Sequence, residues 1–257
     1  MKASRQGRAA SGAAAARSDS VRVDMTVGAP LPQSAKTCLI LFGPPGSGKG
    51  TQAKILSQSL GLAHISTGDM LRAHLAAGDE LGREVSSIMQ SGGLVPDETV
   101  NKMVERRIEA ADCEKGFILD GFPRTVNQAR LLGGVLAAKP ISPVVVHLNV
   151  DYNVVIGRIA GRRQCPTCGA LTSVRSNAPT DSEVCDYDGS KLQVRDDDRP
   201  EVVRERLRAY DAQTAPVLDC LKQLGYPVVE VDGAGGSPQA IAGKIEKRVR
   251  EITDDRA

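Results

Sequence analysis

A glycine-rich segment between an apolar run and a helical pattern constrains the fold of this chain most strongly. Residues 37–42 (TCLILF) form a short continuous apolar run, as a strand buried in a parallel sheet does. Residues 43–51 follow as GPPGSGKGT, and a helical pattern then continues to Leu60. Such a turn directs backbone N–H groups and one lysine toward a single point at a helix N-terminus, where polyphosphate binds well. The sequence therefore predicts a phosphate-binding loop that opens an α/β domain.

Apolar runs and helical patterns alternate along the rest of the chain. Further buried strands are expected at 117–120, 144–150 and 227–231. Strands that alternate with helices predict an α/β fold with a parallel sheet flanked by helices. Helix-start signals occur at Ser66, at Asp97 after a proline, and at Pro238. The expected helices cover 67–77, 79–91, 97–111, 125–137, 152–163, 199–224 and 238–252.

The charge of the chain is unevenly distributed. Residues 1–36 hold six basic and two acidic side chains and show no apolar periodicity. Two interpretations stay open: a disordered extension or a start upstream of the true one, with Met25 as a candidate start, or an organelle transit peptide. The remaining residues hold 27 basic and 29 acidic side chains, a net charge of −2. This balance argues against a nucleic-acid or membrane-surface binder.

No apolar run approaches the roughly 18–20 residues that span a bilayer, and no secretory signal follows the basic start. The chain is also too long and too poor in cysteine for a disulfide scaffold, so a reducing compartment is expected. These observations predict a cytoplasmic protein, or one of an organelle matrix if residues 1–36 are a transit peptide.

Three of the six cysteines lie close together in an unusual segment. Residues 164–198 contain too few large aliphatic side chains to close a hydrophobic core. The segment holds Cys165, Cys168 and Cys185 with Asp188, in the spacing C-x₂-C…C-x₂-D. This spacing predicts a closed tetrahedral metal site, most simply a structural Zn²⁺ that replaces the missing core. Asp186 is an alternative fourth ligand, and Cys38, Cys113 and Cys220 are interpreted as ordinary packing residues.

The order of several motifs resembles one enzyme family. The stretch GPPGSGKGTQA is similar to the phosphate loop of adenylate kinases and related nucleoside monophosphate kinases. Residues 66–72 (STGDMLR) resemble the start of that family's AMP-binding segment, and residues 93–97 (GLVPD) resemble its end. Residues 120–125 (DGFPRT), with Gln128, resemble its central signature. Arginines at 158, 162, 195 and 206 and the acidic pair 197–198 resemble the residues that flank its lid.

The resemblance covers roughly residues 37–252 and implies a division of the chain. A P-loop core would comprise residues 37–65, 96–162 and 199–257. Residues 66–95 would form an AMP-binding insert, and residues 163–198 a zinc-binding lid. Residues 1–36 have no counterpart in the family.

The resemblance also implies a role for individual residues. The expected ATP-binding residues are Gly46, Ser47, Gly48, Lys49, Gly50, Thr51, Arg158, Arg162, Leu171, Thr172 and Gly235. The expected AMP-binding residues are Thr67, Arg72, Leu94, Val95, Gly121, Phe122, Pro123, Arg124, Gln128, Arg195 and Arg206. The expected catalytic residues are Lys49, Asp120, Arg124, Arg158, Arg195 and Arg206. The match of the loop 233–235 is loose, because two glycines follow Ala234.

Asp120 is implied to hold Mg²⁺ through water, since Mg²⁺ keeps several waters in such sites. Gly50 stands where the general loop pattern has Ser or Thr, and the hydroxyl of Thr51 comes one residue later. The acceptor would be an already anionic phosphate oxygen, so no general base is required. This agrees with a chain that has three histidines and many arginines.

The implied reaction is transfer of the γ-phosphoryl group of ATP to AMP, giving two ADP. The alternatives are a kinase for UMP or CMP, or one that uses GTP as the donor. The implied partners are ATP, AMP and ADP, with no nucleic acid and no membrane, and the chain is expected to be a monomer. A zinc-ribbon nucleic-acid binder is disfavoured, because residues 164–198 hold one aromatic side chain and many acidic ones.

Overall fold

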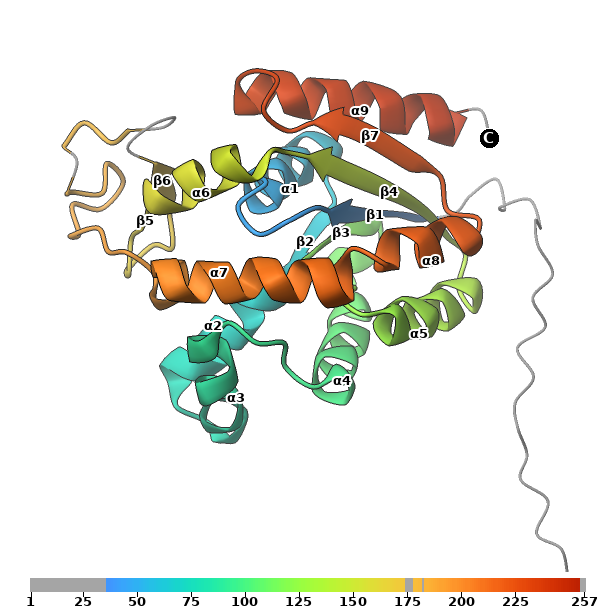
Figure 1. Ribbon diagram of the computed structural model, residues 1–257. Helices are drawn as coiled ribbons and strands as arrows, with labels where there is room; N and C mark the ends of the chain where they lie inside the picture. Colours follow the sequence, from blue (N-terminus) through green and yellow to red (C-terminus); the bar gives the residue numbers. More distant parts are fainter. Residues whose placement is uncertain (1–35, 174–177, 182, 255–257) are drawn as a thin grey trace, which may run out of the picture.

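The computed structural model describes residues 36–173, 178–181 and 183–254. The two interpretations of the N-terminal extension concern residues outside this range. A five-stranded sheet forms the centre of the molecule (Figure 1). Every neighbouring pair in it is parallel, in the order β2-β3-β1-β4-β7, so the predicted α/β fold class is confirmed. The strands are β1 (Lys36–Phe42), β2 (Ala63–Ser66), β3 (Gly116–Asp120), β4 (Ile141–Asn149) and β7 (Val228–Asp232).

Helices cover both faces of the sheet. The central strand β1 shows why: Cys38, Ile40 and Phe42 pack into one hydrophobic cluster, while Leu39 and Leu41 pack into another on the opposite face. A strand buried on both sides has to be apolar at every position, which is the run seen in the sequence. The first cluster lies under α4 (Asp97–Ile108), α5 (Val126–Ala137) and α8 (Val217–Gln223), and the second under α1 (Lys49–Leu60) and α9 (Pro238–Asp254).

Two segments project from the carboxyl edge of the sheet (Figure 1). The helical insert, residues 66–95, contains α2 (Thr67–Ala77) and α3 (Glu80–Ser91). The cysteine-bearing insert, residues 163–198, follows α6 (Tyr152–Ala160) and contains most of a small antiparallel pair, β5 (Arg162–Gln164) and β6 (Leu171–Ser173). Helix α7 (Pro200–Ala209) contacts α3 of the helical insert, α6 of the core, and the 3₁₀ turn Asp196–Asp198 at the end of the cysteine-bearing insert, so it links the two inserts to the core.

Local side-chain chemistry sets several helix starts where the sequence predicts them. The Ser66 side chain accepts a hydrogen bond from the backbone of Asp69 and caps α2. Helix α4 begins at Asp97 after a proline, and α9 begins at Pro238. In the described part of the chain no helix is both long enough and apolar enough to cross a membrane.

Four details of the predicted secondary structure are wrong. Strand β2 is not foreseen, because it has four residues and only Ile65 among them is buried. The helix expected at 152–163 ends at Ala160, since residues 162–164 pair with β6. The helix expected at 97–111 ends at Ile108, and a short 3₁₀ turn follows at Ala111–Cys113. The helix expected at 199–224 is broken by a π-helical turn, Tyr210–Thr214, between α7 and α8.

Candidate active site

The glycine-rich loop connects the end of β1 to the start of α1, at the carboxyl edge of the sheet where open α/β folds bind ligands. Gly48 has φ +102° and precedes α1 without any side-chain cap, so the first N–H groups of the helix are left for a ligand. Gly46 has φ +82°, and a Cβ there would lie 2.7 Å from the Ile159 side chain on α6. The loop therefore needs glycine at these positions to wrap closely beneath α6.

Lys49 lies at the centre of this loop. Its Nζ donates to the backbone oxygens of Gly43 at 2.7 Å and Pro44 at 2.8 Å. Burial lowers the pKa of Lys49 to about 7; the charge of Asp120 opposes this, and those of Arg124, Arg206 and Arg162 add to it. A desolvated ammonium among guanidinium groups requires anions for stability, as polyphosphate would supply.

Asp120 ends β3, directly beside β1 in the sheet. A Cβ on Gly50 would lie 3.2 Å from its Oδ2 atom. The carboxylate thus closely approaches the position where the general loop pattern has a hydroxyl residue, which gives a physical reason for glycine there. His64 on β2 lies beside the same carboxylate, with its Nε2 3.5 Å from Oδ2. Sequence reasoning assigned no role to this histidine.

A cavity opens between the helical insert and the loop after β3. Its walls combine apolar side chains with arginines, a composition that suits a nucleotide. It is lined by Thr67, Gly68, Leu71, Arg72, Met89, Gly92, Gly93, Leu94, Val95, Val100, Gly121, Arg124, Gln128, Asp197 and Arg206. Phe122 and Pro123 are not among the lining residues, and Phe122 packs in the core cluster beneath α4 and α5.

Gln128 is held in one orientation within this cavity. Its Oε1 accepts from the backbone N–H of Arg124 at 2.7 Å, and its Nε2 donates to Oδ1 of Asp97 at 2.8 Å. The Arg124 side chain folds back to donate from Nε to the backbone oxygen of Gly121 at 2.8 Å. Thr67 donates its hydroxyl to the same oxygen at 2.9 Å.

Arginines and aspartates from α2, β5, α7 and the segment before α7 meet beside the cavity, which Arg72, Asp197 and Arg206 help to line. Arg206 donates to the Asp197 carboxylate at 2.7 Å. Arg162 forms a two-pronged contact with the buried Asp198, with Nε to Oδ2 at 2.7 Å. Asp198 therefore pairs with an arginine and does not cap helix α7, whose N-cap residue is Arg199. Arg72 pairs with Asp69 at 2.7 Å and lies 3.7 Å from Asp197.

The electrostatics of this group favour an anionic ligand. Burial lowers the pKa of Arg124 to about 10, and the neighbouring charge of Arg206 adds to this. Burial likewise lowers the pKa of Arg195 to about 10, with the charges of Arg72 and Arg162 adding to the effect. Burial opposes ionisation of Asp197, yet the surrounding arginines outweigh it and lower its pKa. The arginines of this group carry more positive charge than the aspartates neutralise, so the group has an excess of positive charge.

The remaining expected ATP residues lie on two sides of the loop. Arg158 donates from Nη1 to the Ser47 oxygen at 3.1 Å and from Nη2 to the Gly233 oxygen at 2.8 Å, so it ties the phosphate loop to the turn after β7. Gly235 lies in that turn, where its N–H donates to the Asp232 oxygen at 3.3 Å. Leu171 and Thr172 lie on β6 of the cysteine-bearing insert.

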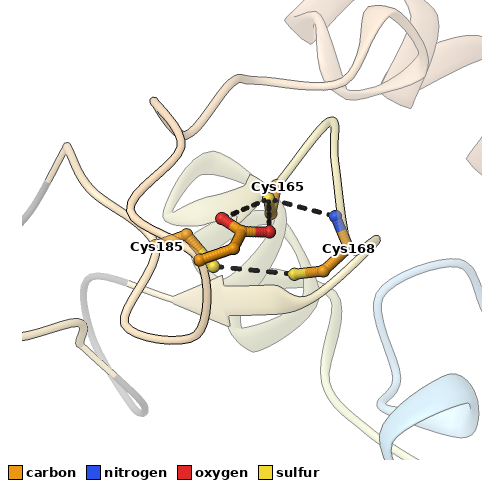
Figure 2. A group of neighbouring side chains, drawn as sticks. Cys165, Cys168 and Cys185 are labelled. Carbon is orange, nitrogen blue, oxygen red and sulfur yellow. Dashed lines mark hydrogen bonds between the residues drawn. The ribbon is translucent and has the colours of Figure 1, made fainter.

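The four predicted metal ligands converge in the cysteine-bearing insert. The Sγ atoms of Cys165, Cys168 and Cys185 and a carboxylate oxygen of Asp188 all lie within 4.8 Å of one another (Figure 2). Cys168 and Cys185 are 3.6 Å apart at sulfur, and Cys165 Sγ is 3.2 Å from Asp188 Oδ2. Ligand atoms at the corners of a zinc tetrahedron lie about 3.5–3.8 Å apart, so these residues fit a zinc ion.

The surroundings of this group support a closed site. Hydrogen bonds from the Ser190 backbone and from the Cys168 and Cys165 thiols lower the pKa of Asp188, which keeps it an anionic ligand. Asp186, the alternative ligand, accepts from the Thr180 backbone N–H at 3.0 Å and lies outside the convergent group. The buried apolar cluster of the described insert comprises Cys165, Cys185 and Leu192, with Ala170 packed against it.

Four contributors to the site were missed by sequence reasoning. Asp97 was interpreted as a helix start and as the end of the segment that resembles the AMP-binding insert, with no site role of its own, yet it holds Gln128. Asp69 pairs with Arg72, and the Gly233 backbone oxygen receives Arg158. Thr214 donates its hydroxyl to the backbone oxygen of Arg124 at 2.9 Å. Asp69, three residues before an arginine on an expected helix, carried a readable signal; the others depend on contacts between distant segments.

Comparison with known proteins gives a consistent result. The family model described as adenylate kinase matches residues 41–226. The adenylate kinase of Anaeromyxobacter dehalogenans strain 2CP-C is 46% identical over 210 residues, which is 81% of this chain and 97% of that protein. The adenylate kinase of Syntrophotalea carbinolica is 50% identical over 196 residues, covering 76% of this chain and 90% of the relative. The adenylate kinase of Chloroherpeton thalassium is 46% identical over 217 residues, or 83% and 96% of the two chains.

Proposed function

The chain belongs to the adenylate kinase family, and we propose how its residues divide the work of the reaction. It is a nucleoside monophosphate kinase that transfers the γ-phosphoryl group of ATP to AMP, reversibly, and gives two ADP. The observation that carries the proposed division is electrostatic. Arg124 and Arg206 line the cavity and at the same time lower the pKa of Lys49 in the phosphate loop through their charges. Two phosphate-binding regions therefore share one group of cations.

The phosphate loop receives the donor. Backbone N–H groups of residues 46–51 surround the phosphates of ATP, and Lys49 exchanges its two backbone acceptors for phosphate oxygens. Arg158 already connects the loop to the turn at Gly233, so it shapes the loop and reaches the same phosphates. Leu171, Thr172 and Gly235 contact the rest of the donor nucleotide.

Asp120 is the residue that would hold Mg²⁺ beside the donor, with the hydroxyl of Thr51 near it. Its place at the end of β3, close to Gly50, fits a carboxylate that binds the ion through water. The ion, when bound, neutralises charge on the phosphates. The chain's own part is to hold the Asp120 carboxylate in place at the edge of the loop.

The cavity behind the helical insert receives AMP. Thr67, Gln128, Leu94 and Val95 surround the base, and Arg72 with Arg124 binds its phosphate. Bidentate guanidinium groups match phosphate oxygens, which a lysine cannot do equally well. Gly121, Phe122 and Pro123 form or support the loop on which Arg124 is placed.

Arg195 and Arg206 span the group in transfer. The reaction mainly requires positioning and neutralisation of charge, because the attacking oxygen is already anionic. When the nucleotides bind, some hydrogen bonds between these arginines and carboxylates must break, and hydrogen bonds from the arginines to phosphate oxygens replace them. The cation excess around Asp197 and Asp198 provides this capacity.

The cysteine-bearing insert acts as a lid that holds a structural Zn²⁺ through Cys165, Cys168, Cys185 and Asp188. Four protein ligands leave no open position, so the metal supplies stability rather than chemistry. Residues 66–95 and 163–198 close over the two nucleotides and exclude water, which would otherwise take the phosphoryl group. Both nucleotides bind within one chain, so the protein is proposed to work as a monomer, in a reducing compartment such as the cytoplasm.

A coupled assay of ADP formation tests these assignments. ATP is offered with AMP, CMP, UMP or GMP as separate acceptors, GTP replaces ATP in a parallel set, and the Lys49→Ala protein serves as the blank. Turnover with AMP well above the other acceptors supports the reading of Thr67 and Gln128. Turnover that favours CMP, UMP or GMP overturns the acceptor assignment, and equal rates with GTP overturn the donor assignment. Metal analysis of protein purified without chelator should give one zinc per chain.

A further inference from the structure

Asp97 holds an arrangement of hydrogen bonds that the proposed roles do not yet use. Its Oδ1 accepts from the Gln128 side chain at 2.8 Å, and its Oδ2 accepts from the Thr125 hydroxyl at 2.8 Å and from the Asn127 amide at 3.1 Å. No ion pair involves Asp97 among the described residues. The carboxylate thus serves three neutral donors from the start of α5.

The Gln128 amide is fixed by two partners of opposite character. A carboxylate oxygen can only accept, so the atom facing Asp97 must be the amide nitrogen. A backbone N–H can only donate, so the atom facing Arg124 must be the amide oxygen. Turning the amide over would place nitrogen against N–H and oxygen against carboxylate, and both contacts would become repulsive. The Gln128 side chain is 2% exposed, so water cannot readily compensate for that loss.

The fixed amide keeps one N–H and one oxygen lone pair for a ligand, and Gln128 lines the cavity. Adenine carries an amino donor at C6 next to a ring acceptor, which matches an amide oxygen beside an amide N–H. Guanine carries an oxygen at C6 next to a ring N–H, which requires the amide the other way round. An amide that cannot turn over therefore accepts one purine and repels the other.

We propose that Asp97 is a specificity-determining positioning residue, which selects AMP over GMP by holding the Gln128 amide in the adenine-reading orientation. This inference rests on the proposed function, because it requires that Gln128 faces the acceptor base. Holding the amide improves the discrimination between AMP and GMP, because an unrestrained Gln128 amide could turn over at small cost and hydrogen-bond to either base.

The test compares Asp97→Ala with the matched control Glu98→Ala. Both residues are acids in the first turn of α4, but Glu98 is exposed, and within the described part of the chain its ion pair is with Lys102. The readout is the ratio of kcat/KM for AMP to that for GMP, together with KM for AMP and for ATP. Asp97→Ala is expected to lower the ratio about tenfold and to raise KM for AMP while KM for ATP stays within twofold. Glu98→Ala is expected to change none of these.

Asp97→Asn separates hydrogen bonding from charge, because it keeps an oxygen in place and should restore most of the selectivity. An unchanged AMP-to-GMP ratio in Asp97→Ala overturns the proposal. An equal loss of selectivity in Asp97→Asn and in Glu98→Ala also overturns it, because the effect would then come from the negative charge at the start of α4. If Asp97→Ala is recovered only unfolded, Asn127→Ala decides. It removes an exposed partner of the same carboxylate, and a fall of about threefold supports the proposal while an unchanged ratio overturns it.

The native protein separates this inference from the function on which it rests. A native enzyme without preference for AMP over GMP overturns the proposed role of Gln128. A native preference for AMP that survives Asp97→Ala overturns the role of Asp97 alone.

Discussion

Binding of Mg·ATP above neutral pH should draw a proton onto Lys49. Burial in the phosphate loop lowers the pKa of this lysine from its ordinary 10.5 to about 7. At pH 8 about nine-tenths of the side chains are therefore neutral before ATP arrives. The phosphates place several negative charges beside the amine and raise its pKa again, so that the bound form is charged. The expected proton uptake is about 0.9 per ATP at pH 8, about 0.5 at pH 7 and about 0.1 at pH 6.

The same numbers set the energy scale. The difference between pKa values of 10.5 and about 7 corresponds to about 5 kcal/mol that disfavours the charged form of the buried lysine. The folded protein without nucleotide binds fewer protons than the unfolded chain, so this group makes stability rise with pH between 7 and 10.5. The affinity for ATP moves in the opposite direction and falls about fivefold from pH 7 to pH 8.

Isothermal titration calorimetry in two buffers of different ionisation enthalpy measures the uptake directly. Mg·ATP is added in the absence of AMP at pH 6, 7 and 8. Lys49→Arg is the control, because an arginine stays charged at every pH used and takes up no proton. A native protein that binds Mg·ATP at pH 8 with the same heat in both buffers would refute the reasoning.

Three further predictions concern the lid, a buried ion pair and a distant hydrogen bond. Cys185→Ser should reduce zinc to well below one per chain by metal analysis and lower the thermal midpoint; full zinc in this variant contradicts the assigned ligands. Arg162→Met leaves the fully buried Asp198 side chain with Arg206 at 3.7 Å, and urea unfolding should show a loss of about 3 kcal/mol. Arg162→Met/Asp198→Leu should regain more than half of it, and no recovery would mean that the uncompensated charge is not the cause. Thr214→Val should raise KM for AMP about fivefold, through loss of its bond to Arg124, while Thr214→Ser should not; equal effects of both would exclude a role for the hydroxyl.

The sequence predicted those parts of the site that depend on short, local patterns. The phosphate loop could be read because its glycines, its lysine and its flanking strand and helix are contiguous. The candidate metal ligands could be predicted because Cys165 and Cys168 are three residues apart and Cys185 and Asp188 repeat that spacing, and the structure brings all four within 4.8 Å of one another. The order of motifs also identified the family, which the comparisons confirm.

The errors in the fold have a common cause. Strand β2 is too short for periodicity to reveal, and it exists because its backbone pairs with β3. The π-helical turn at Tyr210–Thr214 lies in a stretch whose composition suits a continuous helix. A π turn holds one additional residue, which rotates the following side chains around the axis. The turn presents Thr214 to the backbone of Arg124, a contact across 90 residues of sequence.

Composition and local spacing alone determined the fold class, the phosphate loop and the group of candidate metal ligands, because backbone preferences and ligand geometry act over a few residues. The tertiary structure decided which partner each charged or polar side chain takes. Asp97 looks like an ordinary helix start in the sequence and becomes the acceptor for Gln128 only after α5 is folded beside α4. Arg162 finds Asp198 in the same way. Such pairings depend on distances between segments far apart in the chain, and those distances exist only in the packed protein.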